Sequence, residues 1–419
     1  MTHAKPVFSD RRLVMSALPQ SPWANQMVLN PGVIRDPQTD RLHMLFRATG
    51  SGQPDGQSPS PGWGYPIYLG YAYSDDSGAS WHIDDERPAL SPKLATARDE
   101  LLTTDLWGRP CVDFANGCIE DPRLFWFDGQ CHLIVACRVF PPGPYWIVDD
   151  PMQCAPSWVR DASHGLGRAV KDNVTVNLLY RVDLHALASR QYDRAFSYVT
   201  HLTDPEHGEN RDVLLFPRPI VIGGQPKIVC LHRPWESHHF PGGSASMKPS
   251  IWYSVADSLD ELATGKASHR LLVEPILDWE DNRIGASAPP VEIAPGRWLV
   301  SYHGKQDARA GYTQSVLIVE EDDEAGLIVR HRCAERLLVP RESWEMPSKF
   351  KTPCLFVTAL LAEAGRPWQV FYGAADERVG MAACDGEELL RRAERYDARG
   401  CLVGGVAETP KRGRLVAAP

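Results

Sequence analysis

Short apolar and alternating runs recur along the whole chain, and this pattern predicts β-strands. Most of the runs end at Asp-Gly, Gly-Gly or Pro-Gly pairs, which are typical of turns, and Phe127-Asp128-Gly129-Gln130 is the clearest predicted hairpin. Helical periodicity is convincing only near 386–395. The clearest strand runs are 42–47, 67–73, 124–127, 132–136, 228–232, 298–303, 315–320 and 368–372.

The predicted strands fall into five groups of similar size, which indicates an all-β, five-bladed β-propeller. We expect residues 28–390 to form the propeller, residues 1–27 to be an N-terminal extension that closes it, and residues 391–419 to be a C-terminal tail. The groups lie near 28–82, 118–183, 196–265, 284–335 and 352–385.

One turn supports this fold without pointing to chemistry. The string Ser74-Asp75-Asp76-Ser77-Gly78-Ala79-Ser80-Trp81 fits a hairpin in which Asp76 caps backbone donors and Trp81 packs beneath. We interpret it as a structural turn.

Three stretches interrupt the strand spacing: 50–64, 140–172 and 235–249. Each follows a predicted strand, so we expect the three to emerge as long loops over the active-site face of the propeller and to shape a binding site. They carry Trp63, Trp146 and Trp235, whose rings could stack on a bound ligand.

Composition and charge exclude several classes of protein. The chain is 43% hydrophobic and 23% charged, as globular proteins are, and its net charge of −9 gives no basic field for nucleic acid. No apolar run approaches the roughly 18 to 20 residues of a membrane span, and the N-terminus lacks a signal-peptide pattern. The ten cysteines include no Cys-x-x-Cys pair, so we expect free thiols and a cytoplasmic protein.

The most informative local string is Glu120-Asp121-Pro122-Arg123, two carboxylates followed by Pro and Arg at the start of a strand. A carboxyl group that points into the channel of a propeller and is screened from water can act as a general acid. The alternative is a turn with a surface ion pair, and the tetrapeptide alone favours neither interpretation.

A second cluster carries cationic and imidazole donors. It comprises Glu209-Asn210-Arg211-Asp212 and His232-Arg233-Pro234, and Arg47 ends another strand. Such donors can surround a phosphate or a sugar carboxylate, although any one Arg is more often solvated or ion-paired.

A metal or a nucleotide cofactor has little support in the sequence. His201, His207, His238 and His239 lack the spacing of an established zinc motif, and no Gly-rich nucleotide motif occurs. We expect no metal and no cofactor.

Taken together, the strings resemble glycoside hydrolase family 130, the five-bladed propellers that include β-mannoside phosphorylases and some β-mannosidases. The order of the strings along residues 28 to 385 is that of the family. The matching strings are Asn30-Pro31, Leu45-Phe46-Arg47-Ala48, Glu120-Asp121-Pro122-Arg123, Asn210-Arg211-Asp212, Leu215-Phe216-Pro217, His232-Arg233-Pro234, Ile284-Gly285, Pro289-Pro290, Tyr302-His303-Gly304 and Tyr372-Gly373-Ala374-Ala375-Asp376.

The resemblance implies roles for individual residues. Asp121 would be the general acid, which in the family passes its proton through a sugar hydroxyl to the leaving oxygen, and Asp376 would hold hydroxyls of the mannosyl unit. Two departures stand out: phosphorylases typically carry Lys where this chain has Arg211, and Tyr-Thr often replaces Cys137-Arg138. The phosphate-binding residues would be Arg47, Arg211 and His232, and the other substrate-binding residues Asn30, Arg123, Arg233, Tyr302 and His303.

The first functional hypothesis is an inverting phosphorylase that cleaves a β-mannoside with inorganic phosphate to give mannose 1-phosphate. The second is an inverting hydrolase, which needs a carboxylate base about 6.5 to 9.5 Å from the acid, with Glu209 and Glu236 as candidates. A third is a non-catalytic carbohydrate-binding propeller. The expected partners are an oligosaccharide or glycoside and inorganic phosphate, without nucleic acid or membrane, and a homo-oligomer is compatible with the sequence.

Overall fold

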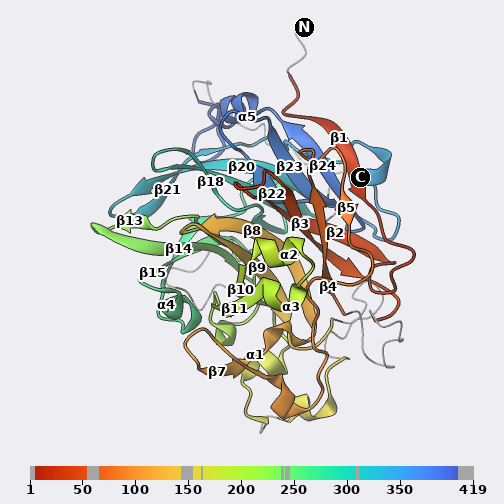
Figure 1. The fold of residues 1–419 in the computed structure, drawn as a ribbon. Coiled ribbons are helices and arrows are strands. Elements are labelled where there is room, and N and C mark those ends of the chain that lie inside the picture. The colour runs from red at the N-terminus through yellow and green to blue at the C-terminus, as the bar shows by residue number, and fades with distance from the viewer. Residues whose placement is uncertain are drawn as a thin grey trace, which may run out of the picture.

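The structure, a computed structural model, describes residues 5–53, 66–142, 154–161, 164–236, 240, 246–307 and 311–403. Five antiparallel sheets follow one another along this part of the chain, and each is one blade of a propeller (Figure 1). This confirms the predicted all-β, five-bladed architecture.

The five blades have the same order of strands, from the inner strand outward. Blade I contains β2 (Met27–Arg35), β3 (Leu42–Thr49), β4 (Tyr68–Ser74) and β5 (His82–Ile83). Blade II contains β8 (Cys118–Phe127), β9 (Gln130–Arg138), β10 (Val176–Val182) and β11 (Phe196–His201). Blade III contains β12 (Asn210–Leu215), β14 (Gln225–Pro234), β15 (Ile251–Ala256) and β16 (Ser268–Val273), with β13 (Ile220–Ile222) paired to β14.

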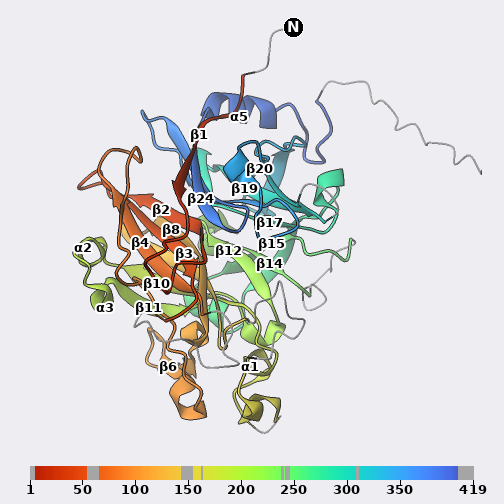
Figure 2. The ribbon, with the colours of Figure 1, turned by 90° about the vertical axis from the view of Figure 1, so that its right-hand side faces the viewer.

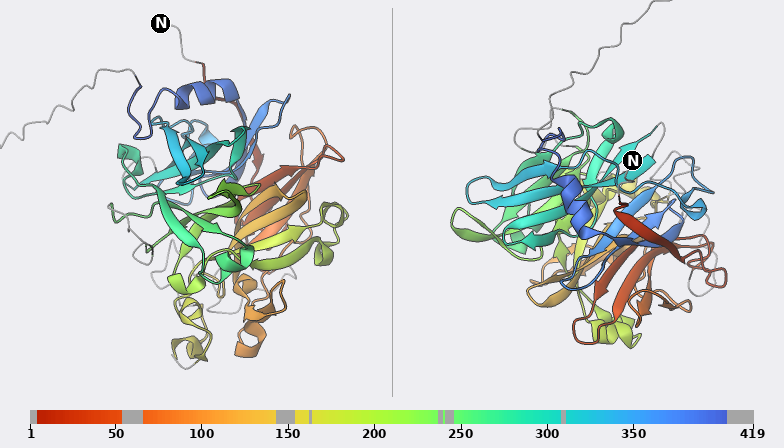
Figure 3. Two further views of the ribbon diagram at one scale, coloured as in Figure 1. Left: turned by 90° about the vertical axis from the view of Figure 1, so that its left-hand side faces the viewer. Right: turned by 90° about the horizontal axis from the view of Figure 1, so that it is seen from above.

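Blades IV and V complete the ring. Blade IV contains β17 (Arg283–Ala286), β19 (Arg297–Gln306), β20 (Gly311–Asp322) and β21 (Gly326–Arg332), with β18 (Val291–Ala294) paired to β19. Blade V contains β22 (Leu355–Leu361), β23 (Trp368–Ala374) and β24 (Arg378–Cys384), and its outer strand is β1 (Phe8–Met15). The N-terminal strand thus pairs with the last strand of the chain, and Figure 3 shows the two side by side.

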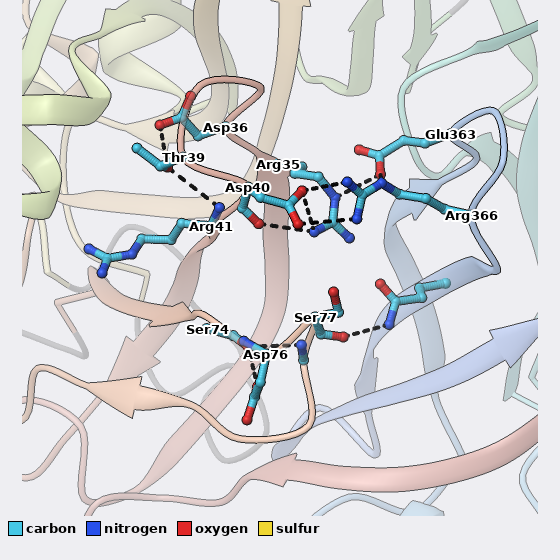
Figure 4. Close-up of polar contacts among 12 residues, drawn as sticks. Arg35, Asp36, Thr39, Asp40, Arg41, Ser74, Asp76, Ser77, Glu363 and Arg366 are labelled. Carbon is cyan, nitrogen blue, oxygen red and sulfur yellow. Dashed lines mark hydrogen bonds and ion pairs between the residues drawn. The ribbon is translucent and has the colours of Figure 1, made fainter.

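Side-chain contacts join the first blade to the last. Arg35 Nε lies 2.7 Å from Glu363 Oε2, Arg366 Nη2 donates to Asp40 Oδ1 over 2.7 Å, and the Gln369 amide donates to the Ser77 carbonyl (Figure 4). Together with β1, these contacts hold the two ends of the propeller ring in register.

Two predicted turns have the expected geometry. Asp128 and Gly129 have φ angles of 49° and 70° between β8 and β9, as a two-residue hairpin requires. Asp76 accepts hydrogen bonds from the backbone and side chain of Ser80, and Trp81 packs edge-on against Phe371 of blade V.

The antiparallel order of the strands separates two ends of the propeller. In each blade the inner strand begins at one end, and the second strand ends there. The three stretches that were expected to form long loops follow the second strands β3, β9 and β14, so they start at the same end. The hairpin of β6 (Leu102–Thr104) and β7 (Pro110–Val112) and the segment with α1 (Arg168–Lys171) project at this end (Figure 2). We call this end the upper end, although Figures 1 and 2 draw it at the bottom, and we call the opposite end the lower end.

Helices are short and peripheral. The predicted helix near 386–395 is α5 (Gly386–Ala393), and α2 (Leu184–Ala188), α3 (Tyr192–Ala195) and α4 (Leu259–Ala263) occupy connections within blades II and III. The expected tail at 391–419 begins inside α5, and the chain stays packed beyond it, because Arg332 N donates to the Asp397 carbonyl and Tyr396 Oη to Glu335.

All ten cysteines lie in the described ranges as free thiols, and eight of them are buried. Among these residues, no helix is long and apolar enough to cross a bilayer.

The junction of the inner strands of blades I and V gives a stability prediction. Thr358 is fully buried, and its Oγ1 donates to the Pro31 carbonyl over 2.6 Å. Thr358→Val keeps the shape but leaves this buried carbonyl unpaired, so we expect the protein to lose about 1–3 kcal/mol of unfolding free energy in a urea titration. The control Thr264→Val removes an exposed hydroxyl that donates to Asp260, and we expect it to cost less than about 0.5 kcal/mol. Equal losses in both variants would contradict this role of Thr358.

Candidate active site

Three inner strands carry an Asn or Asp in the left-handed backbone conformation. Asn30, Asp121 and Asp212 have φ angles of 47°, 52° and 54°, each at a β-bulge where the pairing register shifts. Asn and Asp tolerate this conformation better than other non-glycine residues. The bulges re-aim these side chains toward neighbouring blades.

Two side chains of blade I contact the carboxylate of Asp121. Asn30 Nδ2 donates to Asp121 Oδ1 over 2.7 Å, and Arg47 Nη1 lies 3.1 Å from the same oxygen. Burial by itself would raise the pKa of this carboxyl group. The guanidinium groups of Arg47 and Arg123 outweigh burial and, with the Asn30 amide, hold the pKa below its ordinary value. Asp121 is therefore an anion in this state.

Arg47 also binds the preceding carboxylate. Its Nη1 lies 2.9 Å from Glu120 Oε2, and Glu120 accepts a weak hydrogen bond from the Cys118 thiol. Arg123 adopts a different role, since it donates to the Asp121 carbonyl and, across the ring, to the Ser287 carbonyl of blade IV. Arg123 thus fixes the backbone that carries Asp121.

Asp376 has the opposite electrostatic character. It lies in the turn between β23 and β24 with a φ of 56°, and the Cys354 thiol donates to its Oδ1. Burial raises its pKa above the ordinary value, although Arg47 and Cys354 act against this, and the negative charge of Asp121 adds to the rise. Two carboxyl groups whose pKa values are pushed apart are characteristic of acid–base sites.

Arg211 is paired with Glu209, the candidate base. Arg211 Nε donates to Glu209 Oε1 over 2.7 Å, and Arg138 Nη2 lies 3.2 Å from Glu209 Oε2. Burial raises the pKa of Glu209, but the two arginines lower it to about 2. Glu209 is thus a firmly ionised group with weak basicity.

Arg233 and His303 meet at Asp212. Arg233 Nε donates to Asp212 Oδ2 over 2.5 Å, and His303 Nε2 lies 3.5 Å from the same oxygen. Burial lowers the pKa of His303 to about 3, so the ring is neutral, and its Nδ1 is paired with Ser287 Oγ.

Blades II and III meet around a small cavity. Its lining includes Asp121, Arg123, Arg211 and Asp212, which places the candidate acid and the second cationic cluster around the same space. Within the described ranges, four buried side-chain atoms of this region have no hydrogen-bond partner: Asn30 Oδ1, Asn210 Oδ1, Arg233 Nη1 and His303 Nε2. Buried polar atoms are rarely left unpaired, and their concentration here indicates a site built for a polar ligand.

Two predicted ligands point elsewhere. His232 has both ring nitrogens engaged, Nδ1 with the Asn210 amide at 3.0 Å and Nε2 with His269 at 3.3 Å. Burial lowers its pKa well below the ordinary value, so it is neutral and has no ring nitrogen free for phosphate. Tyr302 is a core residue, fully buried, and its hydroxyl donates to Glu280. Its hydroxyl is therefore engaged in the core, and its role as a substrate-binding residue stays a prediction.

Other predicted residues lie at the periphery. Glu236 is exposed, with Oε2 3.6 Å from Arg168 Nη2. Trp235 is half exposed, while Trp63, Trp146, His238 and His239 fall outside the described residues. In the parts of the chain that the structure describes, no group of three His, Cys, Asp or Glu side chains could hold a metal ion.

The structure adds a cation that sequence reasoning missed. Arg283, at the start of β17, donates from Nε and Nη2 to the Tyr312 hydroxyl, at 3.0 and 2.7 Å, and its guanidinium lies 5.2 Å from the Trp235 ring. Among the described residues it has no carboxylate partner. Its only signal in the sequence was its place before the Ile284-Gly285 string.

The fold and the site together define a five-bladed propeller in which the carboxylate of Asp121 is surrounded by arginine side chains at one end of the channel. Residues 174–395, just over half of the chain, match the family described as beta-1,4-mannooligosaccharide phosphorylase. The chain belongs to this family, glycoside hydrolase family 130, as the sequence strings indicated.

Individual relatives agree with this assignment. A beta-1,4-mannooligosaccharide phosphorylase of Ruminococcus albus is 33% identical over 178 residues, 41% of this chain and 47% of the relative. A beta-1,2-mannobiose phosphorylase of a Thermoanaerobacter species is 30% identical over 26% of this chain and 35% of its own. The matched segments thus span about half and about a third of these relatives. The structure of a beta-1,2-mannobiose phosphorylase from Listeria innocua has the same fold, with a TM-score of 0.56 at 16% identity over 93% of this chain and 95% of that chain.

A glycine makes the contact between Asn30 and Asp121 testable. A Cβ on Gly373 would lie 1.9 Å from Asn30 Oδ1, so Gly373→Ala must displace the Asn30 amide that donates to Asp121. Losing one hydrogen bond to a charged group is worth about 1.5–3 kcal/mol, so we expect kcat/KM to fall at least roughly tenfold. In an Asn30→Ala background the clashing oxygen is gone, and Gly373→Ala should then cost little further activity. A full additional loss in the double variant would contradict this coupling.

Proposed function

We propose that this protein is an inverting glycoside phosphorylase that cleaves a β-mannoside with inorganic phosphate and releases α-mannose 1-phosphate. The observation that carries the proposal is one half-buried carboxylate, Asp121, surrounded by arginines from several blades. An inverting phosphorylase needs one acid and an anion site, because phosphate itself is the nucleophile.

The charge balance of the site supports a bound anion. Arg47 and Arg211, the predicted phosphate ligands, already face Glu120 and Glu209. Arg283 donates to the Tyr312 hydroxyl and has no carboxylate partner among the described residues, while Arg233 is paired with Asp212 through Nε and keeps a buried Nη1 without a hydrogen bond. We propose that phosphate binds toward blades III and IV, between Arg211 and these two arginines, and that Asp376 on blade V holds the mannosyl hydroxyls.

Phosphate would also set the protonation of the acid. A general acid must carry a proton, whereas the surrounding arginines keep Asp121 ionised before phosphate binds. A phosphate dianion beside these arginines offsets their positive charge and raises the pKa of Asp121. The nucleophile and the proton of the acid would thus arrive together.

A hydrolase has less support from the site. Its base must accept a proton from water, and Glu209, with a pKa of about 2, is a poor acceptor. Glu236 lies exposed beside Arg168. The arginine-surrounded carboxylate of Asp121 and the proposed anion site likewise exceed what a non-catalytic carbohydrate-binding propeller needs.

Product analysis tests the proposal directly. Incubation with β-1,4-mannobiose and phosphate should give α-mannose 1-phosphate, detected by ³¹P NMR, and cleavage should be negligible without phosphate. Equal cleavage in phosphate-free buffer with release of free mannose would overturn the phosphorylase assignment.

Asp121→Asn should abolish turnover while the protein stays folded. The amide cannot supply the proton, and a general acid contributes about 10² to 10⁴ in rate. Circular dichroism and thermal unfolding check the fold, and the rate of mannose 1-phosphate release checks the chemistry. A folded variant with near-normal activity would remove Asp121 from the mechanism.

Arg211→Ala should weaken the binding of phosphate more than the binding of sugar. Charge-assisted contacts are worth about 1.5–3 kcal/mol, so the KM for phosphate should rise by about one to two orders of magnitude. The KM for mannobiose should stay nearly unchanged. Arg330→Ala, which removes an exposed arginine paired with Glu320, is the control and should change neither constant. A parallel rise of both constants in Arg211→Ala would argue against a specific phosphate contact.

We further propose a cytoplasmic location and no cofactor besides phosphate as co-substrate. The supporting observation is the set of ten free thiols, which suits a reducing compartment.

A further inference from the structure

A second concave site lies at the lower end of the propeller, between blades I and II. It is an open groove between the β2–β3 hairpin, the β8–β9 turn and α2. We call it the lower groove, and its lining includes Gln38, His43, Trp126, Gln130, Arg181 and His185.

The lower groove is separate from the candidate active site. Asp121 and Trp126 lie on the same strand, β8, five residues apart, which at 3.3 Å per residue is about 16 Å. Asp121 lies near the start of this strand, at the upper end, and Trp126 lies near its finish.

One buried side chain in the lining lacks a partner. His43 is 1% exposed, and its Nδ1 is paired with the Tyr71 hydroxyl at 2.9 Å, but its Nε2 is buried without a hydrogen bond. Burial lowers the pKa of His43 to about 4, so the ring is neutral and offers one polar atom to a ligand. Such an atom is typical of a built binding site.

The other lining groups combine a fixed aromatic ring with mixed donors and acceptors. The Trp126 indole donates to the Arg35 carbonyl over 3.3 Å, which holds the ring in place. Asp36 and Arg41 at the rim are held by Thr39 and Asp75, and Figure 4 shows these rim residues on the side of the hairpin away from blade V. Among the described residues, the side chains of Gln38, Gln130 and Arg181 make no hydrogen bond or ion pair.

The charges of the lining balance. Asp36 and Asp183 are matched by Arg41 and Arg181, so the groove has no net field for a polyanion or a cation. A flat ring, side-chain amides that both donate and accept, and zero net charge suit a ligand rich in hydroxyl groups with apolar C–H faces.

We propose that the lower groove is a second binding site for a neutral oligosaccharide. The identity of the sugar, a β-mannooligosaccharide, rests on the proposed function. Bound there, a long substrate is retained near the enzyme while other chain ends enter the active site.

Calorimetric titration with β-1,4-mannotetraose tests this site in the full-length protein. The wild type should bind two molecules per chain, and the double variant Gln130→Ala/Arg181→Ala should bind one, or bind the second at least tenfold more weakly. Both side chains are exposed and make no hydrogen bond or ion pair within the described residues, so the fold should survive, and mannobiose phosphorolysis should be unchanged. Arg194→Ala, an exposed arginine on α3 outside the lining, is the matched control and should keep both binding events.

The outcomes separate the two proposals. One binding event in the wild type, or a second event that the double variant leaves unchanged, would overturn the lower groove as a sugar site. A dimer that the double variant dissociates in size-exclusion chromatography would also overturn it, since a second copy would then fill the groove. Two binding events without any phosphorolysis would instead overturn the proposed activity and leave the groove in place.

Discussion

The site depends on the contact of one guanidinium group with two adjacent carboxylates. Arg47 of blade I lies within 3.1 Å of both Glu120 and Asp121 on the inner strand of blade II, and its charge also acts on Asp376 of blade V. Three blades are therefore coupled through one cation. The same cation keeps Asp121 ionised, which is the wrong state for an acid until another anion arrives.

The propeller makes this contact by bending its inner strands. Asn30, Asp121 and Asp212 have left-handed backbone conformations at β-bulges, and their side chains lie close to a neighbouring blade. Two glycines leave room for these side chains. A Cβ on Gly373 would lie 1.9 Å from Asn30 Oδ1, and a Cβ on Gly285 would lie 2.0 Å from Asp212 Oδ2. Backbone geometry and the absence of two side chains thus set the spacing of the polar groups.

The sequence predicted the blades and Asp121 because both depend on local patterns: strand spacing, Asp-Gly turns and one contiguous string. The predicted residues that lie apart from Asp121 share a structural reason for their placement. Successive residues of a strand face opposite sides, so in Tyr302-His303 and in His232-Arg233 only one member can face the site. In each pair the second residue reaches Asp212, while Tyr302 packs in the core and His232 against His269. A short sequence motif does not show which of two successive residues faces the site. It also does not show the contact of Arg138 with Glu209, because the two residues belong to different blades.

If Asp121 is the general acid, phosphate binding should protonate it. Calorimetric titration of phosphate into the wild type and into Asp121→Asn, in buffers of different ionisation enthalpy between pH 5 and 8, measures the protons taken up. Protons exchanged by phosphate itself are common to both proteins, so the difference belongs to Asp121. We expect the wild type to take up more protons than the variant as phosphate binds. Identical proton uptake at every pH, with phosphate bound in both proteins, would contradict it.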